Sequence, residues 1–177
     1  SVTQQFNTTT SMGRLTLNML LSFAQFEREI AGERIRDKIA ASKAKGMWMG
    51  GNIPLGYDAR DRKLVINEAE ANTVRMIFRR YAALGSVTLL QEELDRQGVR
   101  SKQREGAGGR LAGGLPFSRG ILYLILQNHL YHGEVEHKGN VYPGQHEAIV
   151  DADLWSIVQD KLAANRKARE LAVGSKA

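Results

Sequence analysis

The 177-residue chain contains no cysteine. This absence excludes disulfide bonds, thiolate-ligated zinc and a cysteine nucleophile, and it suits a reducing compartment. The sequence also lacks any apolar run that approaches the roughly 20 residues of a membrane span, and no charged and then apolar leader opens it. We therefore expect a cytoplasmic protein with no membrane partner.

Acidic residues are too few to balance the basic ones. The chain has 25 Lys and Arg against 19 Asp and Glu, so its formal net charge is +6. A basic balance favours an anionic partner, although charge alone does not distinguish DNA from RNA or an anionic membrane. With 42% hydrophobic residues, the chain can bury one core, or form a small domain with an appendage.

Residues 1–11 lack an initiator methionine and begin with the alternating stretch SVTQQF, followed by NTTTS. Alternation followed by turn-forming residues is typical of a strand and its turn. We therefore expect the chain to be a fragment that opens within a sheet.

A long helix is predicted for residues 12–46, because no proline occurs before Pro54. Thr10 and Ser11 are candidate N-caps, and Gly46 can adopt the left-handed conformation that ends a helix. Such a helix would extend about 50 Å. That length exceeds what a small domain can cover.

The two halves of this helix differ in chemistry. Apolar side chains from Leu15 to Phe26 point almost all round the helix, which requires protein contacts on more than one side. The candidates for an oligomer interface are Leu15, Met19, Leu20, Phe23 and Phe26. Beyond Glu27 the helix is charged, and both a solvated face with ion pairs and a DNA-binding face fit the pattern. The candidate DNA contacts are Arg28, Arg34, Arg36, Lys38, Lys43 and Lys45.

Residues 47–56, MWMGGNIPLG, form a predicted linker between the helix and the remainder of the chain. A segment with glycines, a proline and no charge pattern is usually a plain linker. Trp48 beside a basic helix end also fits a nucleic-acid groove, where a narrow backbone passes and apolar side chains touch sugars.

Residues 57–165 are predicted to form a compact, mainly α-helical DNA-binding domain with small β-hairpins. YDARDRKLVIN alternates as a hairpin does. Asn67 and Glu70 form a predicted capping box for a helix that ends at Gly85, and Ser86 is the predicted N-cap of the next helix. Phe78 is assigned to the core of this domain.

Ser118 is the predicted N-cap of a third helix, in which Ile121, Leu122, Ile125 and Leu126 face inward. Two helices with a break between them are typical of a helix-turn-helix, whose second helix enters the major groove by its N-terminal end. The candidate DNA contacts of this helix are Ser118, Arg119 and Tyr123.

A long Gly-rich segment, VRSKQREGAGGRLAGGLPF, stands where a helix-turn-helix has a turn of roughly 3–4 residues. Loops of this length are functional or disordered more often than idle. A mobile arm that tracks phosphates and a disordered surface loop both fit the composition. The candidate DNA contacts of the segment are Arg100, Lys102, Arg104 and Arg110.

The last part of the chain is predicted to hold a second hairpin, turning at residues 138–140, and a helix with Asp151 as N-cap and Trp155 in the core. A basic tail is expected over residues 166–177. No H-x-x-x-H pair of the four histidines sits on a predicted helix, and nothing resembles a P-loop or a Ser-His-Asp triad. We expect no metal, no cofactor and no small-molecule substrate.

Five short segments carry a family resemblance: MGRL, FAQFERE, ERIRDKI, NEAEANTVRMIFRRY and NHLYHGEV. In this order and spacing they resemble the large serine recombinases, from the end of the catalytic domain through the recombinase domain. The resemblance covers nearly the whole chain. It implies that residues 1–11 are the remnant of a catalytic-domain sheet.

The resemblance also implies an activity and a source. Members of this family, encoded by bacteria or phages, bind double-stranded DNA attachment sites as dimers and tetramers that form through the long helix. They recombine DNA through a phosphoserine link without a cofactor. Their nucleophilic serine has no match in Ser1, Ser11 or Ser22, so we assign no catalytic residue and do not expect the fragment to cut DNA.

Three elements of this chain match DNA-contacting parts of the family. Arg34 matches an arginine that contacts DNA near the cleavage point. Arg28 matches an arginine near the dimer and DNA surface, and the linker with Trp48 corresponds to a segment that follows the minor groove. These roles are implied by the resemblance.

Two other functions fit part of the pattern. A DNA-binding regulator with no enzyme attached would use the helix-turn-helix-like domain alone. A protein-interaction module would use the long helix as a coiled coil, although the apolar pattern loses its heptads after Ile30.

Overall fold

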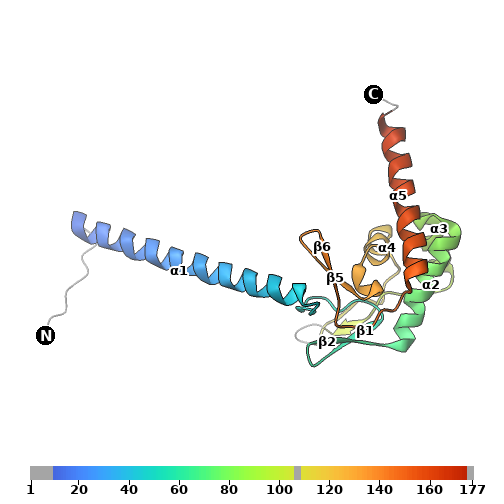
Figure 1. The fold of residues 1–177 in the computed structure, drawn as a ribbon, viewed down its shortest axis with the longest axis horizontal. Coiled ribbons are helices and arrows are strands. Elements are labelled where there is room, and N and C mark those ends of the chain that lie inside the picture. The colour runs from blue at the N-terminus through green and yellow to red at the C-terminus, as the bar shows by residue number, and fades with distance from the viewer. Residues whose placement is uncertain (1–9, 106–108, 175–177) are drawn as a thin grey trace. The chain divides into compact units, whose positions relative to one another are not determined.

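The computed structural model describes residues 10–105 and 109–174, and the chain divides into two units, Ser1–Ala41 and Ser42–Ala177 (Figure 1). The predicted sheet remnant at residues 1–11 lies almost entirely outside the described residues. The chain is mainly α-helical with small antiparallel hairpins, which confirms the predicted fold class.

The first unit consists of helix α1, Ser11–Ala44, whose last residues belong to the second unit. The hydroxyl of Thr10 accepts a hydrogen bond from the Gly13 amide at 3.1 Å and so caps the helix. Gly46 has a φ of 73° and its amide bonds the carbonyl of Lys43. The helix therefore starts and ends on the predicted signals, because a left-handed glycine terminates an α-helix at little cost.

The second unit is built from helices and three two-stranded sheets. Its helices are α2 (Glu68–Leu84), α3 (Val87–Arg96), α4 (Arg119–Leu126), the short 3-10 helix η1 (His129–His132) and α5 (Ala152–Gly174). Its antiparallel pairs are β1 (Tyr57–Arg60) with β2 (Lys63–Ile66), β3 (Arg104–Glu105) with β4 (Leu111–Ala112), and β5 (Glu134–His137) with β6 (Asn140–Pro143).

Polar caps fix where these helices begin. The side chains of Asn67, Ser86 and Ser118 accept hydrogen bonds from amides three residues on, and Asp151 accepts from the Leu154 amide at 2.8 Å. All four caps were predicted. The reciprocal half of the predicted capping box is absent, because the carboxylate of Glu70 accepts from the Gly56 amide instead.

The core lies where α2 packs against α3 and α5, and where α3 packs against α4. Phe78 of α2 is fully buried and stacks on Trp155 of α5 with ring centroids 6.0 Å apart, as the core assignment of both residues predicts. Leu122 and Leu126 of α4 are also fully buried. Ile121 was predicted to face inward but is 42% exposed, because α4 buries only a narrow stripe.

Both predicted hairpins are present. Each turns on a two-residue loop with positive φ angles: Asp61 and Arg62 (48° and 61°) between β1 and β2, and Lys138 and Gly139 (51° and 79°) between β5 and β6. At the other end of the unit, α5 continues to Gly174. Residues 166–174 of the predicted basic tail therefore continue helix α5.

Candidate nucleic-acid interface

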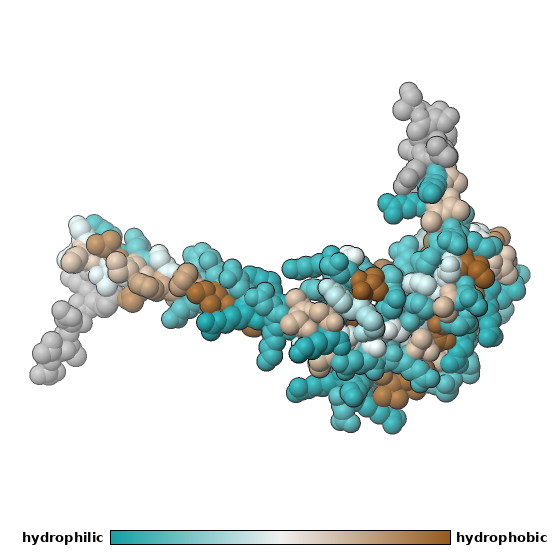
Figure 2. All heavy atoms as spheres, in the orientation of Figure 1, coloured by the Kyte–Doolittle hydropathy of each residue, from teal (hydrophilic) through white to brown (hydrophobic). Residues whose placement is uncertain are grey.

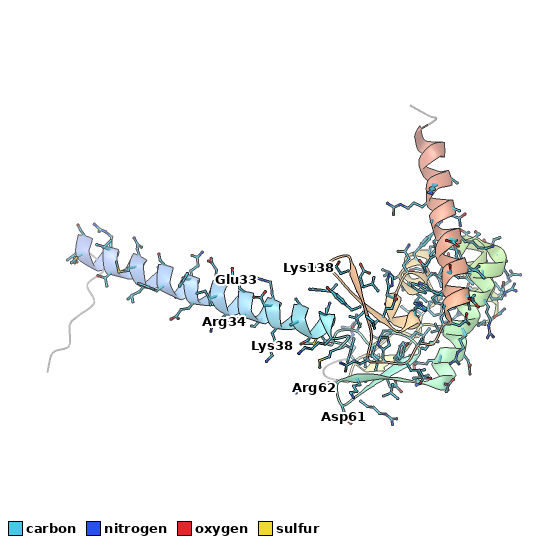
Figure 3. The ribbon with its side chains drawn as sticks, viewed as in Figure 1. Glu33, Arg34, Lys38, Asp61, Arg62 and Lys138 are labelled. Atoms are coloured by element: carbon cyan, nitrogen blue, oxygen red, sulfur yellow. The ribbon has the colours of Figure 1, made fainter. Side chains whose placement is uncertain are left out.

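The charged half of α1 carries four predicted DNA contacts within the first unit. Arg28, Arg34, Arg36 and Lys38 are exposed, and none forms an ion pair with an acid of the described residues. Arg34 and Lys38, labelled in Figure 3, lie one turn apart and share a face, whereas Arg36 points to the opposite side, because residues two apart on a helix differ by about 200°. The cations therefore spread over several faces of the helix.

The apolar half of the same helix is uncovered by any part of the chain that the structure describes. Leu15, Met19, Leu20, Phe23 and Phe26 are each between 52% and 60% exposed, and no residue of α1 is buried. Figure 2 shows apolar side chains along this helix. Large apolar side chains rarely stay in water over a continuous surface, so this surface, which we call the apolar girdle, has the character of an interface.

The start of the linker is fixed to the second unit. Gln145 donates from its side chain to the Lys45 carbonyl and from its backbone to the Gly46 carbonyl, both at 2.9 Å. A Cβ placed on Gly46 would overlap the carbonyl oxygen of Pro143, so only glycine fits this contact. The chain therefore leaves α1 along a defined path.

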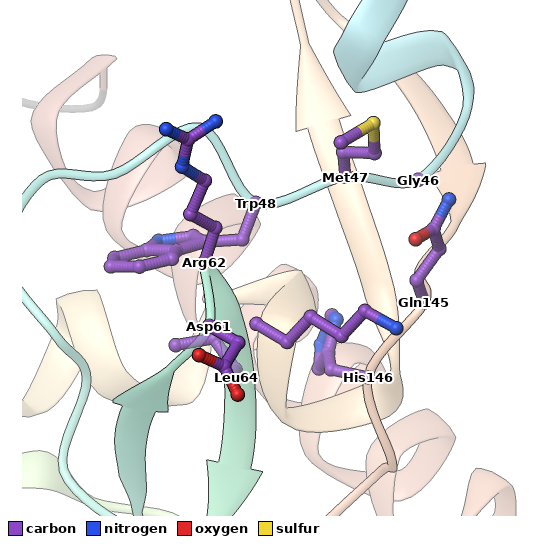
Figure 4. Close-up of a pocket in the computed structure, with 9 residues that line it drawn as sticks. Gly46, Met47, Trp48, Asp61, Arg62, Leu64, Gln145 and His146 are labelled. Carbon is purple, nitrogen blue, oxygen red and sulfur yellow. The ribbon is translucent and has the colours of Figure 1, made fainter.

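Trp48 lies within this path and is half-buried against the hydrophobic core (Figure 4). The indole packs partly on protein, and the predicted contact of its ring with a DNA groove stays a prediction. Met47 and Met49 beside it are 38% and 42% exposed. Pro54 and Leu55 are buried, so the end of the predicted linker belongs to the compact domain.

The Gly-rich segment is a two-stranded ribbon where it is described, at residues 100–105 and 109–116. Ser101 donates to the Leu115 carbonyl at 2.9 Å and accepts from the Gly114 amide at 3.1 Å. Beyond these bonds, β3 pairs with β4. The predicted mobile arm or disordered loop is therefore wrong for this part of the segment.

Lys102 was predicted to contact phosphates, and the structure places it inside the fold instead. Its ammonium donates to the Tyr57 carbonyl at 2.6 Å, to Asp58 Oδ1 at 3.0 Å and to Glu70 Oε2 at 2.7 Å. The side chain is only 10% exposed, and three acceptors match the three protons of an ammonium group. The hydrogen bond from Lys102 lowers the pKa of Asp58. Lys102 is thus an internal anchor.

The remaining cations of the ribbon differ in their surroundings. Arg100 pairs with Asp95 at 3.0 Å on the surface. Arg110 is exposed and forms no ion pair with an acid of the described residues. Arg104 lies in β3, where its backbone pairs with Ala112. Arg110 is therefore the ribbon cation most available to a ligand among those whose side chains are described.

The N-terminal end of α4 presents the other predicted contacts. Ser118 Oγ accepts from the Ile121 amide at 3.3 Å, so its hydroxyl is already engaged as a cap. Arg119 and Tyr123 are exposed on the first turns of the helix. Residues 97–118 separate α3 from α4, so the pair differs from a helix-turn-helix with a short turn although the helices pack together.

Three of the four histidines contact other residues of the second unit. His129 Nδ1 lies 2.8 Å from Glu134 Oε2, His132 stacks on Trp155 with centroids 5.6 Å apart, and His146 Nε2 lies 2.7 Å from the Leu130 carbonyl. Among the described residues, no group of three His, Cys, Asp or Glu could hold a metal ion. The described helices also include none that is long and apolar enough to cross a bilayer.

Comparison with known proteins gives matches to two family models. Residues 68–165 match the Recombinase model, and residues 1–48 match the model of the Resolvase N terminal domain. A comparison with curated proteins finds no match.

Two solved structures are similar to this chain. A crystal structure of a large serine recombinase (LSR)–DNA complex is 27% identical to this chain, with a TM-score of 0.59. The match covers 75% of this chain and 38% of the solved chain. A structure concerning the sequence requirements of the Listeria innocua prophage attP site is 28% identical to this chain, with a TM-score of 0.59. This match covers 74% of this chain and 51% of the solved chain. The chain thus spans between 38% and 51% of the length of these solved chains.

The Recombinase match covers more than half of the chain, and it coincides with the compact domain that follows α1 and the linker. The Resolvase match covers α1 up to Trp48. The order of the two matches is the order that the five sequence segments predict. This chain therefore belongs to the large serine recombinase family.

Proposed function

We propose that this chain is the DNA-binding portion of a serine site-specific recombinase that acts on a double-stranded attachment site. The observation that carries the proposal is the division of α1 into an exposed apolar girdle and a charged half that exposes Arg28, Arg34, Arg36 and Lys38, with the Recombinase match further along the same chain. A helix of this kind contacts protein at one end and a polyanion at the other. The two similar structures, which concern an LSR–DNA complex and an attP site, support DNA as that polyanion.

The reaction of the whole protein follows from the family. It exchanges DNA strands in integration and excision, or in inversion, through a phosphoserine intermediate. Within this chain, the role is to bind and position the duplex. We place the protein in the cytoplasm of a bacterium, on the nucleoid.

The basic residues of α1 hold the sugar-phosphate backbone. Arg34 and Lys38 share one face, and Arg28 and Arg36 extend the positive surface to other faces, so the helix can cross a duplex with phosphates on either side. Lys43 and Lys45 continue this surface at the end of the helix. Guanidinium groups suit phosphate because two N–H donors can bond one phosphate at once.

The second unit recognises the base sequence of the attachment site. Arg119 and Tyr123 stand exposed at the start of α4, where a helix enters the major groove by its N-terminal end. Arginine can bond guanine O6 and N7 together, which makes it suited to base recognition. Arg110 on the ribbon contacts neighbouring phosphates, and Arg104 and Arg100 stand with it as further candidates.

The apolar girdle joins copies of the protein. We propose that Leu15, Met19, Leu20, Phe23 and Phe26 pack against the same residues of another copy to form a dimer, and that dimers form a tetramer. Two apolar helices that each expose such side chains remove them from water by pairing.

Selection from a randomised duplex library tests the proposal. The folded chain should enrich one sequence family, and Arg119→Ala should broaden the enriched set because it removes a base contact. Arg79→Ala on the exposed side of α2 is the matched control and should leave the set unchanged. Failure of the folded wild-type chain to retain any duplex at low salt would refute the proposal.

A further inference from the structure

The turn between β1 and β2 carries an arginine at a position that favours glycine. Asp61 and Arg62 both have left-handed φ angles, 48° and 61°. Two-residue hairpin loops of this kind prefer Asn-Gly or Asp-Gly, because a side chain at the second position strains the backbone. The turn between β5 and β6 follows that preference, with Lys138 and then Gly139. The same chain thus contains the relaxed and the strained version of one turn.

No ion pair of the described residues holds the side chain of Arg62. The residue is exposed and forms no ion pair with any acid that the structure describes. Arg60 and Lys63 on the same tip are exposed and form no ion pair with a described acid, although the charge of Arg60 acts on Asp58, which Lys102 already holds. The turn and its flanks thus carry three cations and one carboxylate, Asp61. A strained backbone that no ion pair of the described residues offsets points to a ligand.

The tip of this hairpin lies against the start of the linker. A pocket of about 130 Å³ is lined by Asp61, Arg62 and Lys63 from the tip and by Gly46 and Trp48 from the linker. Figure 4 shows Arg62 beside Trp48, with Gly46 and Gln145 across the pocket. Gln145 holds the carbonyls of Lys45 and Gly46, which fixes the linker side of this pocket.

We propose that Arg60, Arg62 and Lys63, together with Lys45, form a phosphate-binding lobe that grips the DNA backbone beside the linker. The lobe rests on the proposed function and adds residues to it. Its groups are long cations without an amide or a stacking ring of their own, so they suit phosphate rather than base edges. Arg62 stands out among them, because the strained turn holds its side chain beside Trp48 of the linker.

The exchange of Arg62 for glycine tests the lobe without damage to the fold. Arg62→Gly gives this turn the relaxed sequence of the other, so the variant should unfold at the same or a higher denaturant concentration than the wild type. Its affinity for a duplex should fall about tenfold, as the loss of a charge-assisted bond predicts. The slope of log affinity against log salt should become shallower by about one.

Lys63→Ala and Arg79→Ala complete the design. Lys63→Ala should weaken binding in the same way, whereas Arg79→Ala removes an equal charge from exposed α2 and should change affinity less than about twofold. Wild-type affinity and slope for Arg62→Gly, or equal losses for Arg62→Gly and Arg79→Ala, would overturn the lobe while the proposed function stands. Absence of duplex binding by the folded wild type would instead refute the proposed function and the lobe with it.

Discussion

The ammonium of Lys102 lies 2.7 Å from Glu70 Oε2 and so ties the Gly-rich ribbon to the first turn of α2. Glu70 also accepts the amide of Gly56 at 3.0 Å, which adds the end of the linker to the same cluster. Three segments that are distant in sequence thus meet at one carboxylate. The ribbon owes its fixed position to this cluster.

Replacement of Lys102 should destabilise the second unit. We expect Lys102→Met to lower the free energy of unfolding by about 2–3 kcal/mol, less than for a fully buried pair because the carboxylates keep access to water. The side chains of Asp58 and Glu70 are 43% and 25% exposed. Urea denaturation measures the loss. Arg100→Ala is the control and should cost less than about 1 kcal/mol, since its pair with Asp95 is on the surface. Equal losses would contradict an anchoring role.

The contact of Gly46 with Pro143 makes a second prediction. Gly46→Ala should destabilise the chain by about 3 kcal/mol, because the added methyl group strains a left-handed residue and overlaps a carbonyl. Gly50 has a φ of 89°, but a Cβ added at this residue would have no neighbouring atom within 4 Å. Gly50→Ala should therefore cost only about 1 kcal/mol, from the backbone alone. Thermal unfolding of both variants gives the comparison, and a Gly46→Ala variant as stable as Gly50→Ala would show that the linker start is loose.

His146 should make stability depend on pH. Burial lowers the pKa of His146, against the hydrogen bond with the Leu130 carbonyl, and its ring packs edge-on against Tyr57. The unfolded chain takes up a proton near pH 6.5 while the folded chain does not until a lower pH. Stability should therefore be constant above about pH 7 and decline below about pH 6.5. Denaturation between pH 5 and about pH 8 should show a flatter curve for His146→Gln than for the wild type. Identical curves would mean that His146 is freely solvated.

The apolar girdle should drive self-association. A variant with Leu20→Asp and Phe23→Asp should be monomeric at concentrations where the wild type associates, because each carboxylate would lose its hydration in the interface. Sedimentation velocity separates the species. Leu124→Asp is the control, since Leu124 of α4 is 72% exposed and lies in the other unit. A loss of association in the control as well would point to non-specific aggregation.

Local signals made most of the fold predictable. The caps at Asn67, Ser86, Ser118 and Asp151 are each decided by contacts within three residues, so the sequence alone identifies them. The same holds for both hairpin turns. The long helix follows from a run without proline and from the glycine at its end.

Contacts between residues that lie far apart in the sequence could not be predicted. Lys102 bonds Asp58 and Glu70, which lie 44 and 32 positions away. Nothing in its Gly-rich neighbourhood distinguishes such an anchor from a phosphate ligand. The partial burial of Trp48 was not predicted for a related reason, since the surface that covers it comes from elsewhere in the second unit. For the DNA contacts, the sequence identified cations but not which of them have internal partners.

The most direct test of DNA binding by this chain is the salt dependence of its affinity for a duplex, measured for the wild type and for a variant with Arg34→Ala and Lys38→Ala. We predict a slope of log affinity against log salt of about −4 or steeper for the wild type, and a slope shallower by about two for the variant, because each lost phosphate contact removes about 0.9. A wild-type slope near zero, or a slope that the two substitutions leave unchanged, would contradict a DNA-binding role for α1.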